Sequence, residues 1–212
     1  DFQGRKKIGL TDSHDYYSFC ARKIRDLAKA FPCVRIGIDS QGGGYTIAES
    51  LRDLDKLREG ERPIYEIIEE DKAKETDDLA GDHILHLINF ASAIWTSQAN
   101  HGMRKDLEDK VLLFPRFDTL TLSLMTEKDK IFFNEMKQKT GETDALRLYD
   151  TLEDGVMEIE ELKDELSGIV MTVTPAGRER WNTPEIKLDT GKKGRLRKDR
   201  YSALVIANMI AR

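Results

Sequence analysis

The chain has 212 residues, of which 39% are hydrophobic and 34% charged, and its formal net charge is −5. This composition is typical of one sizeable polar globular domain, and no apolar run approaches the roughly 18 residues that predict a membrane-spanning helix. The negative total argues against a generally basic nucleic-acid binder, so a role of that kind would depend on where the basic residues lie.

The start of the chain and its cysteines give further expectations. The first residue is Asp1 rather than Met, so we expect a fragment of a longer protein. The N-terminus lacks the basic flank and apolar core of a signal peptide. Cys20 and Cys33 form no CxxC pair, which predicts neither a disulfide scaffold nor a zinc site and fits a reducing cytoplasm.

The first part of the chain predicts alternating helices and strands. Tyr16–Phe31 has apolar residues at helical spacing and stops at Pro32. Val34–Asp39 alternates as a strand, and the glycines Gly42–Gly44 then lead into a helix from about Tyr45 to Leu57. Units of this kind are typical of α/β folds, in which catalytic groups gather at the carboxyl ends of strands.

Further elements are expected on both sides of this unit. The charged stretch 69–82 predicts a mobile surface loop. Pro115 closes the apolar run 111–114, so a buried strand that ends at this proline is expected over 111–115. The other expected elements are a strand end at 6–10, a strand at 63–68, a helix at 84–98 and a short helix at about 103–108.

The second half is predicted to be mainly helical, over 118–151 and 157–167. Between these and the end, 169–174 and 178–181 flank a Pro-Ala-Gly turn and predict a β-hairpin. A last helix is expected to begin near Asp199.

Two carboxylates are candidates for a metal site. Asp39 ends a hydrophobic strand beside three glycines, which would let a nucleic-acid backbone approach closely. Asp199 begins a helix directly after a basic segment. Magnesium binds a few carboxylates together with phosphate oxygens and water, and two such ions about 3.5–4 Å apart can activate water and stabilise a leaving oxygen.

The basic segment Lys187–Arg200, which runs into the last helix, would supply contacts to phosphates. Its positive charge gives sequence-independent affinity for DNA. Only Asp189 and Asp199 oppose that charge. The residues expected to contact phosphates are Lys192, Lys193, Arg195, Arg197, Lys198 and Arg200.

Each feature also has a structural interpretation. Asp39 could be a turn residue and Asp199 a helix N-cap with a favourable dipole contact. The basic segment could be solvated surface. Gly42–Gly44 could bind phosphate, although the chain has neither GxGxxG nor GxxxxGKS/T there. None of these features alone identifies an enzyme.

Taken together and in order, four segments resemble the nuclease domain of the large terminase subunit of tailed bacteriophages. The resemblance covers about residues 1–212, apart from the charged segments 66–82 and 118–155, the second of which would be a helical insertion. The four segments are Ile36–Gly44 (strand-Asp-x-x-Gly), Val111–Pro115 (a strand ending in Phe-Pro), Met157–Leu166 (a "Glu-Leu-Lys" helix) and Arg197–Asn208 (the closing motif).

The resemblance implies one α/β nuclease domain over 1–212, of the RNase H-like type, with a central mixed sheet flanked by helices. The implied activity is a Mg²⁺- or Mn²⁺-dependent endonuclease, with two ions, that cuts concatemeric viral double-stranded DNA during genome packaging. Asp39 matches the second acid of the family's cluster and Asp199 the last. The family's first acid has no match here. Either the opening strands are absent, in which case the metal site is incomplete and we expect weak activity or none, or the chain is a divergent relative of the family.

The resemblance also implies partners and a location. The partners would be double-stranded DNA, an ATPase domain of the same polypeptide, a portal protein and a small terminase subunit, without a membrane. The location would be the cytoplasm of an infected bacterium and, transiently, the procapsid portal. The alternatives are another RNase H-like nuclease of resolvase or transposase type, a non-catalytic DNA-binding packaging module, and a nucleotide-binding protein that uses Gly42–Gly44.

Overall fold

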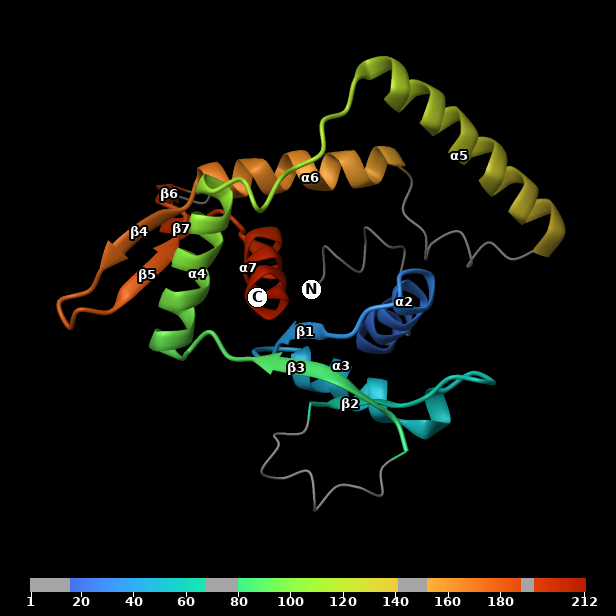
Figure 1. Ribbon diagram of the computed structural model, residues 1–212, viewed down its shortest axis with the longest axis horizontal. Helices are drawn as coiled ribbons and strands as arrows, with labels where there is room; N and C mark the ends of the chain where they lie inside the picture. The colour runs from blue at the N-terminus through green and yellow to red at the C-terminus, as the bar shows by residue number, and fades with distance from the viewer. Residues whose placement is uncertain (1–15, 68–79, 141–151, 188–192) are drawn as a thin grey trace. The chain divides into compact units, whose positions relative to one another are not determined.

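The computed structural model describes residues 16–67, 80–140, 152–187 and 193–212, with backbone alone at 133, 136–140, 187 and 193. Within these ranges the protein is mixed α/β, with six α-helices, a three-stranded sheet and two antiparallel hairpins (Figure 1). The chain divides into two compact units, Asp1–Ala91 and Ser92–Arg212. The single domain expected over 1–212 stays a prediction.

The first unit contains a parallel sheet with the strand order β1-β3-β2. In the register, Asp39 lies opposite Ile88 at the end of β1 and β3, and Ile64 lies opposite Asp82 at the start of β2 and β3. Because the strands are parallel, Asp39 and Ile88 end at the same edge of the sheet. The bounds are β1 Ile36–Asp39, β2 Ile64–Glu66 and β3 Asp82–Ile88.

Two helices share the core of this unit. They are α2 (Tyr16–Ala30) and α3 (Gly44–Arg52), and a short 3₁₀ turn, η1 (Leu54–Lys56), follows α3. The two helices pack against each other, and α3 also contacts β2 and β3. The resulting core consists of Ala21, Ala48, Leu51, Ile64 and Leu85, all at most 5% exposed. The two helices and two strands predicted in this region are thereby confirmed, although the helix expected to reach Leu57 ends at Arg52 and residue 68 lies outside the described residues.

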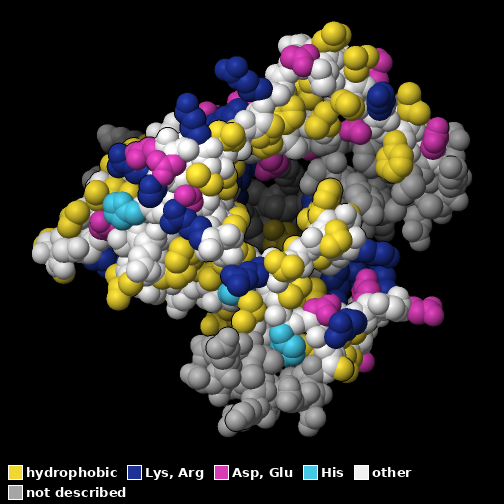
Figure 2. Space-filling view, viewed as in Figure 1, with side chains coloured by type: hydrophobic (Ala, Val, Ile, Leu, Met, Phe, Trp, Pro, Cys, Tyr) yellow, Lys and Arg dark blue, Asp and Glu magenta, His cyan; other side chains and the backbone are white. Residues whose placement is uncertain are grey.

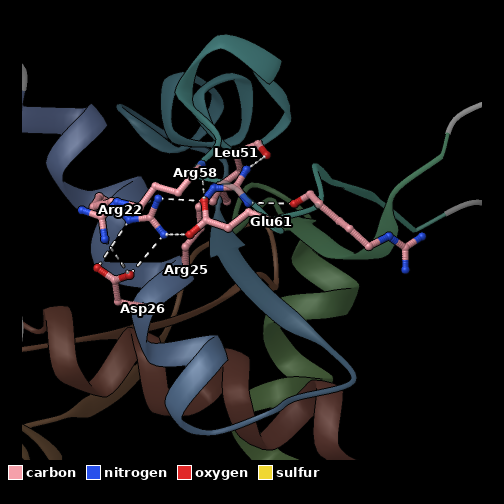
Figure 3. Close-up of polar contacts among 7 residues, drawn as sticks. Arg22, Arg25, Asp26, Leu51, Arg58 and Glu61 are labelled. Atoms are coloured by element: carbon pink, nitrogen blue, oxygen red, sulfur yellow. Dashed lines mark hydrogen bonds and ion pairs between the residues drawn. The ribbon is translucent and has the colours of Figure 1, made fainter.

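Charged side chains tie α2 to the turn before β2 (Figure 3). Arg22 on α2 donates to Glu61 at 2.9 Å. Arg25 is only 7% exposed and donates to the carbonyl oxygens of Leu51 and Arg62, the latter at 2.8 Å. Burial lowers the pKa of Arg25, and the two carbonyl acceptors satisfy a guanidinium that would otherwise be costly to bury.

The second unit is mainly helical. Helix α7 packs against both α4 and α6, and α5 packs against α6. The start of α6 is tied to α5, because Asp129 accepts a hydrogen bond from the backbone N–H of Leu152 at 2.7 Å. The bounds are α4 Ala93–Glu108, α5 Thr119–Thr140, α6 Leu152–Ser167 and α7 Asp199–Ala211.

Two small hairpins complete this unit. The first pairs β4 (Val170–Val173) with β5 (Glu179–Asn182) around Gly177, whose φ of 78° favours glycine. The second pairs β6 (Glu185–Lys187) with β7 (Lys193–Arg195), and the sequence reasoning had missed it. The first hairpin and the helices α5, α6 and α7 are confirmed within the described ranges, which do not include 141–151.

Hydrophobic side chains remain at the surface along α5, as Figure 2 shows for the face in view. Leu120 is 71% exposed, Ile131 59% and Phe132 53%. The sequence of this helix has apolar residues on several sides, so one packing contact with α6 cannot cover them all. The helical character expected for 118–155 is confirmed as far as Thr140.

The helix predicted at 84–98 is wrong over 84–92 and confirmed over 93–98. Residues 82–88 form β3, and α4 begins at Ala93, where the Ser92 hydroxyl accepts from the backbone N–H of Trp95 at 3.4 Å. Strand β3 is paired on both sides and its residues are buried to similar degrees on both faces, so it lacks clean period-2 alternation. The short helix expected at about 103–108 is the second half of α4.

The buried strand predicted at 111–115 is also wrong. Val111 is 75% exposed and Leu113 69% exposed. After α4, Lys110 takes a φ of 59°, and the amides of Val111 and Leu112 both donate to the carbonyl of Asp106. These bonds turn the chain back on the helix end, which is incompatible with an extended strand.

The sheet also differs from the prediction, since the three described strands are parallel and not mixed. The strand end expected at 6–10 and most of the loop expected at 69–82 lie outside the described residues. None of the helices in the described ranges has the length and hydropathy of a membrane-spanning segment.

Candidate functional site

Asp39 lies at the carboxyl end of β1, as the sequence predicts. Its Oδ1 accepts a hydrogen bond from the backbone N–H of Gln41 at 3.0 Å. This is an Asx turn, in which the aspartate side chain closes the turn after its own strand. The carboxylate is therefore held beside the backbone at the sheet edge and remains partly exposed.

The neighbouring strand brings an amide oxygen to the same edge. Asn89 follows the last residue of β3, and its Oδ1 accepts from the backbone N–H of Ala91 at 2.8 Å and from Gln41 Nε2 at 3.4 Å. Ser40, which is 4% exposed, donates from both its backbone N–H and its hydroxyl to the carbonyl of Ile88. Two adjacent strand ends are thus fastened together around Asp39.

Sequence reasoning missed the position of Asn89 because it placed this residue inside a helix. The signal that could have found it is the polar Asn89 directly after the apolar run 84–88, the same pattern that marks Asp39.

Steric reasons internal to the fold explain the glycines after Asp39. A Cβ at Gly44 would lie 1.9 Å from the carbonyl oxygen of Asp39, and one at Gly43 would lie 2.0 Å from the ring of Tyr17. Gly42 has a φ of 67°, which L side chains rarely adopt. The close approach of a DNA backbone to these glycines remains a prediction beside this structural role.

Asp199 is the first residue of α7 and is exposed. The residue before it, Lys198, makes no side-chain capping hydrogen bond. A carboxylate in the first turn of a helix interacts favourably with the helix dipole, which is the structural role the sequence left open. Asp199 belongs to the second unit and Asp39 to the first, so the predicted approach of the two stays a prediction.

The predicted phosphate contacts differ in their surroundings. Arg195 on β7 is exposed and pairs with Glu185 at 3.3 Å, and Arg197 is exposed as well. Lys198 donates to the carbonyl of Trp181 at 2.6 Å, and burial lowers its pKa. Lys192 lies outside the described residues, and only the backbone of Lys193 is described.

Arg200 has three carboxylate partners on α6. Its Nε donates to Glu158 at 2.5 Å, Nη1 donates to Glu165 at 3.2 Å, and Nη2 pairs with Glu161. These carboxylates raise the pKa of Arg200 above its ordinary value. Arg200 thus has three carboxylate partners, whereas the one ion pair described for Arg195 is exposed.

A serine, a histidine and a glutamate also meet in the second unit. Ser97 Oγ lies 2.9 Å and His101 Nε2 3.0 Å from Glu179, and Trp181 Nε1 donates to the same carboxylate at 3.3 Å. A hydrolytic triad needs the serine next to the histidine, whereas here both face the carboxylate. The cluster fastens the β4–β5 hairpin to α4, and these contacts lower the pKa of Glu179.

The donors near Asp39 suit a hard divalent cation in type. Carboxylate and amide oxygens are ligands that Mg²⁺ and Mn²⁺ accept. In the part of the chain that is described, however, no three His, Cys, Asp or Glu side chains gather as metal ligands. At the Asp39 edge the described residues thus provide a carboxylate and the amide oxygen of Asn89, but no cluster of three such ligands.

The chain matches no protein-family model, no curated protein and no solved structure. The terminase resemblance, which includes the motifs Ile36–Gly44 and Arg197–Asn208 with the two candidate acids, therefore stays a prediction.

Proposed function

We propose that the chain is the nuclease part of a viral large terminase subunit, an endonuclease that cuts double-stranded DNA with Mg²⁺ or Mn²⁺ during genome packaging. The observation that supports this most is the position of Asp39. It ends a strand of a parallel sheet, where α/β proteins carry their ligands and catalytic groups. The mixed α/β architecture is compatible with an RNase H-like domain, which is part of the proposal.

In this proposal Asp39 and Asp199 hold the metal. The bound ions would activate a water and neutralise charge on the leaving oxygen. The Asx turn holds Asp39 at the sheet edge, so little ordering of its side chain would be needed when a cation binds. Further carboxylates would complete the ligand set, including the first acid of the family cluster, which has no match in this chain.

Arg195 and Arg197 are the proposed contacts to the DNA backbone. The pair between Arg195 and Glu185 is exposed and contributes little, so exchanging the carboxylate for a phosphate costs little. Contacts to phosphates carry no base information, which suits an enzyme with little sequence preference. An ATPase domain of the same polypeptide, a portal protein and a small terminase subunit belong to the proposal as partners.

A plasmid cleavage assay tests the proposal. This chain, and a form extended at its N-terminus by the strands that the resemblance implies, would be incubated with supercoiled plasmid and Mg²⁺, Mn²⁺ or chelator. We expect nicked and linear products with either ion and none with chelator. Absence of metal-dependent cutting by both forms would exclude the nuclease and leave the non-catalytic DNA-binding module.

Matched substitutions keep the assay specific. Asp39→Asn and Asp199→Asn should each abolish cutting without unfolding the protein. Asp55→Asn in the first unit and Asp109→Asn in the second alter exposed aspartates outside the proposed site and should cut at the parent rate. Cutting at the parent rate by both site variants would show that the assignment of Asp39 and Asp199 is wrong.

A further inference from the structure

Three glutamates on one face of α6 converge on a single arginine. Glu158, Glu161 and Glu165 are spaced by three and four residues, which places them on the same side of the helix. All three contact the guanidinium of Arg200, the second residue of α7, which is 28% exposed at its side chain. Since the carboxylates outnumber the arginine, they overcompensate its charge locally.

One of these glutamates also caps α7. The first N–H groups of a helix have no partner within the helix, and a side chain at the N-cap usually accepts from one of them. Lys198 occupies that position and makes no such bond. Glu165 Oε2 instead accepts from the backbone N–H of Tyr201 at 2.8 Å, while its Oε1 accepts from Arg200.

We infer that Glu158, Glu161 and Glu165 form a clamp on Arg200 that fixes the first turn of α7 and thereby aims the carboxylate of Asp199. Asp199 directly precedes the clamped arginine and lies within the turn that Glu165 caps. The clamp is a property of the second unit alone. Its consequence for cleavage rests on the proposed function.

Arg200 is thereby a positioning residue and not the phosphate contact that the sequence predicts. The planar guanidinium donates in several fixed directions at once, which the point charge of a lysine cannot reproduce. A DNA phosphate would have to displace carboxylates that already satisfy these donors. Arg200 should therefore influence the rate of the chemical step more than the affinity for DNA.

The test compares Arg200→Lys and Arg200→Gln with Arg104→Gln, which removes an exposed pair with Glu108 on α4. The kcat and KM of cleavage would be measured on the form of the protein that cuts. The affinity for DNA would be measured separately, over a range of salt concentrations. We expect both Arg200 variants to lower kcat by up to about 10²-fold, with KM and the salt dependence unchanged. Arg104→Gln should match the parent.

A rise in KM and a shallower salt dependence with unchanged kcat would overturn the inference, because they are the signature of a direct phosphate contact. Parent-like kinetics in Arg200→Gln would overturn it equally.

Amide hydrogen exchange tests the clamp without any cleavage. Glu165→Ala removes both the cap and one ion pair, whereas Glu165→Gln keeps an acceptor for Tyr201. We expect exchange at Tyr201 to accelerate by about tenfold in Glu165→Ala and by less in Glu165→Gln. Equal exchange in the parent and both variants would show that no cap exists. Failure of the parent to cut DNA, together with this exchange pattern, would reject the proposed nuclease and keep the clamp.

Discussion

The hydroxyl of Tyr201 donates to Oδ1 of Asn100, and the two residues are only 3% and 2% exposed. Asn100 Nδ2 in turn donates to the carbonyl of Thr96 at 2.6 Å. Burial raises the pKa of Tyr201, so its hydroxyl keeps its proton and remains a donor. This buried pair joins α4 to the first turn of α7, the turn that carries Asp199.

Removing the hydroxyl of Tyr201 should destabilise the protein, because the buried Asn100 Oδ1 loses its hydrogen-bond donor. Tyr201→Phe leaves Asn100 Oδ1 buried without this donor, and we expect a loss of about 1–3 kcal/mol in the free energy of unfolding. Urea denaturation measures the loss, with Tyr45→Phe as an exposed control. Combining Tyr201→Phe with Asn100→Leu should cost less than the sum of the two single changes, and strict additivity would contradict the coupling.

The contact between Gly44 and Asp39 predicts a second loss of stability. A Cβ at Gly44 would lie 1.9 Å from the carbonyl oxygen of Asp39, so Gly44→Ala must move the backbone at the end of β1. We expect a cost of about 3 kcal/mol or more. Gly155→Ala is the control, because outside the adjacent residues and the helix's own nearby backbone no atom lies within 4 Å of its added Cβ, and alanine favours the helix α6. Equal stability of the two variants would contradict the steric explanation.

The ion pair between Arg22 and Glu61 predicts a dependence of stability on pH. The hydrogen bond from Arg22 lowers the pKa of Glu61 from 4.5 to about 2. Because the carboxylate is the favoured form in the folded state, its contribution is fully present above pH 4.5 and is lost as the pH falls toward 2. With the Glu61 side chain 20% exposed, we expect Glu61→Gln to cost about 2 kcal/mol at pH 7.

Urea denaturation of Glu61→Gln and the parent at several pH values measures this effect. The difference in stability should shrink as the pH falls from 4.5 to about 2. Glu59→Gln removes an exposed charge two residues away and serves as the control. A difference that is the same at every pH would show that Glu61 acts through packing and not through its charge.

The basic residues on and after β7 predict how DNA binding depends on salt. Arg195→Gln and Arg197→Gln should each weaken binding for all sequences alike and reduce the slope of log K against log salt by about 0.9. Arg104→Gln, on exposed α4 surface, should leave the slope unchanged. Fluorescence anisotropy with two unrelated duplexes at several salt concentrations measures the slope. Unchanged slopes in both variants would remove these residues from the DNA-binding surface.

The sequence predicted elements wherever a local signal was strong. Pro32 ends the first helix, the glycines after Asp39 mark the turn out of β1, and the Pro-Ala-Gly turn joins β4 to β5. It failed where the outcome depends on long-range pairing. The apolar run 84–88 became a strand because β1 and β2 lie on its two sides, while 111–115 found no such partner among the described strands.

The candidate site shows the same division. The position of Asp39 followed from a local pattern, and so did that of Asp199 at a helix start. The partners of Arg200 did not follow, because a run of basic residues looks alike whether it faces solvent or three glutamates from another helix. Asn89 was missed because its place at the sheet edge depends on the pairing of β1 with β3.

Metal-directed cleavage of the protein backbone tests most directly whether Asp39 and Asp199 hold the same ions. Fe²⁺ bound in place of Mg²⁺, with ascorbate and peroxide, produces radicals that cut only the chain close to the ion. We predict cuts near both residue 39 and residue 199. Excess Mg²⁺ should suppress both cuts, and the single substitution Asp39→Asn should abolish both. Cuts near one aspartate only, or cuts near 199 that persist in Asp39→Asn, would contradict a shared metal site.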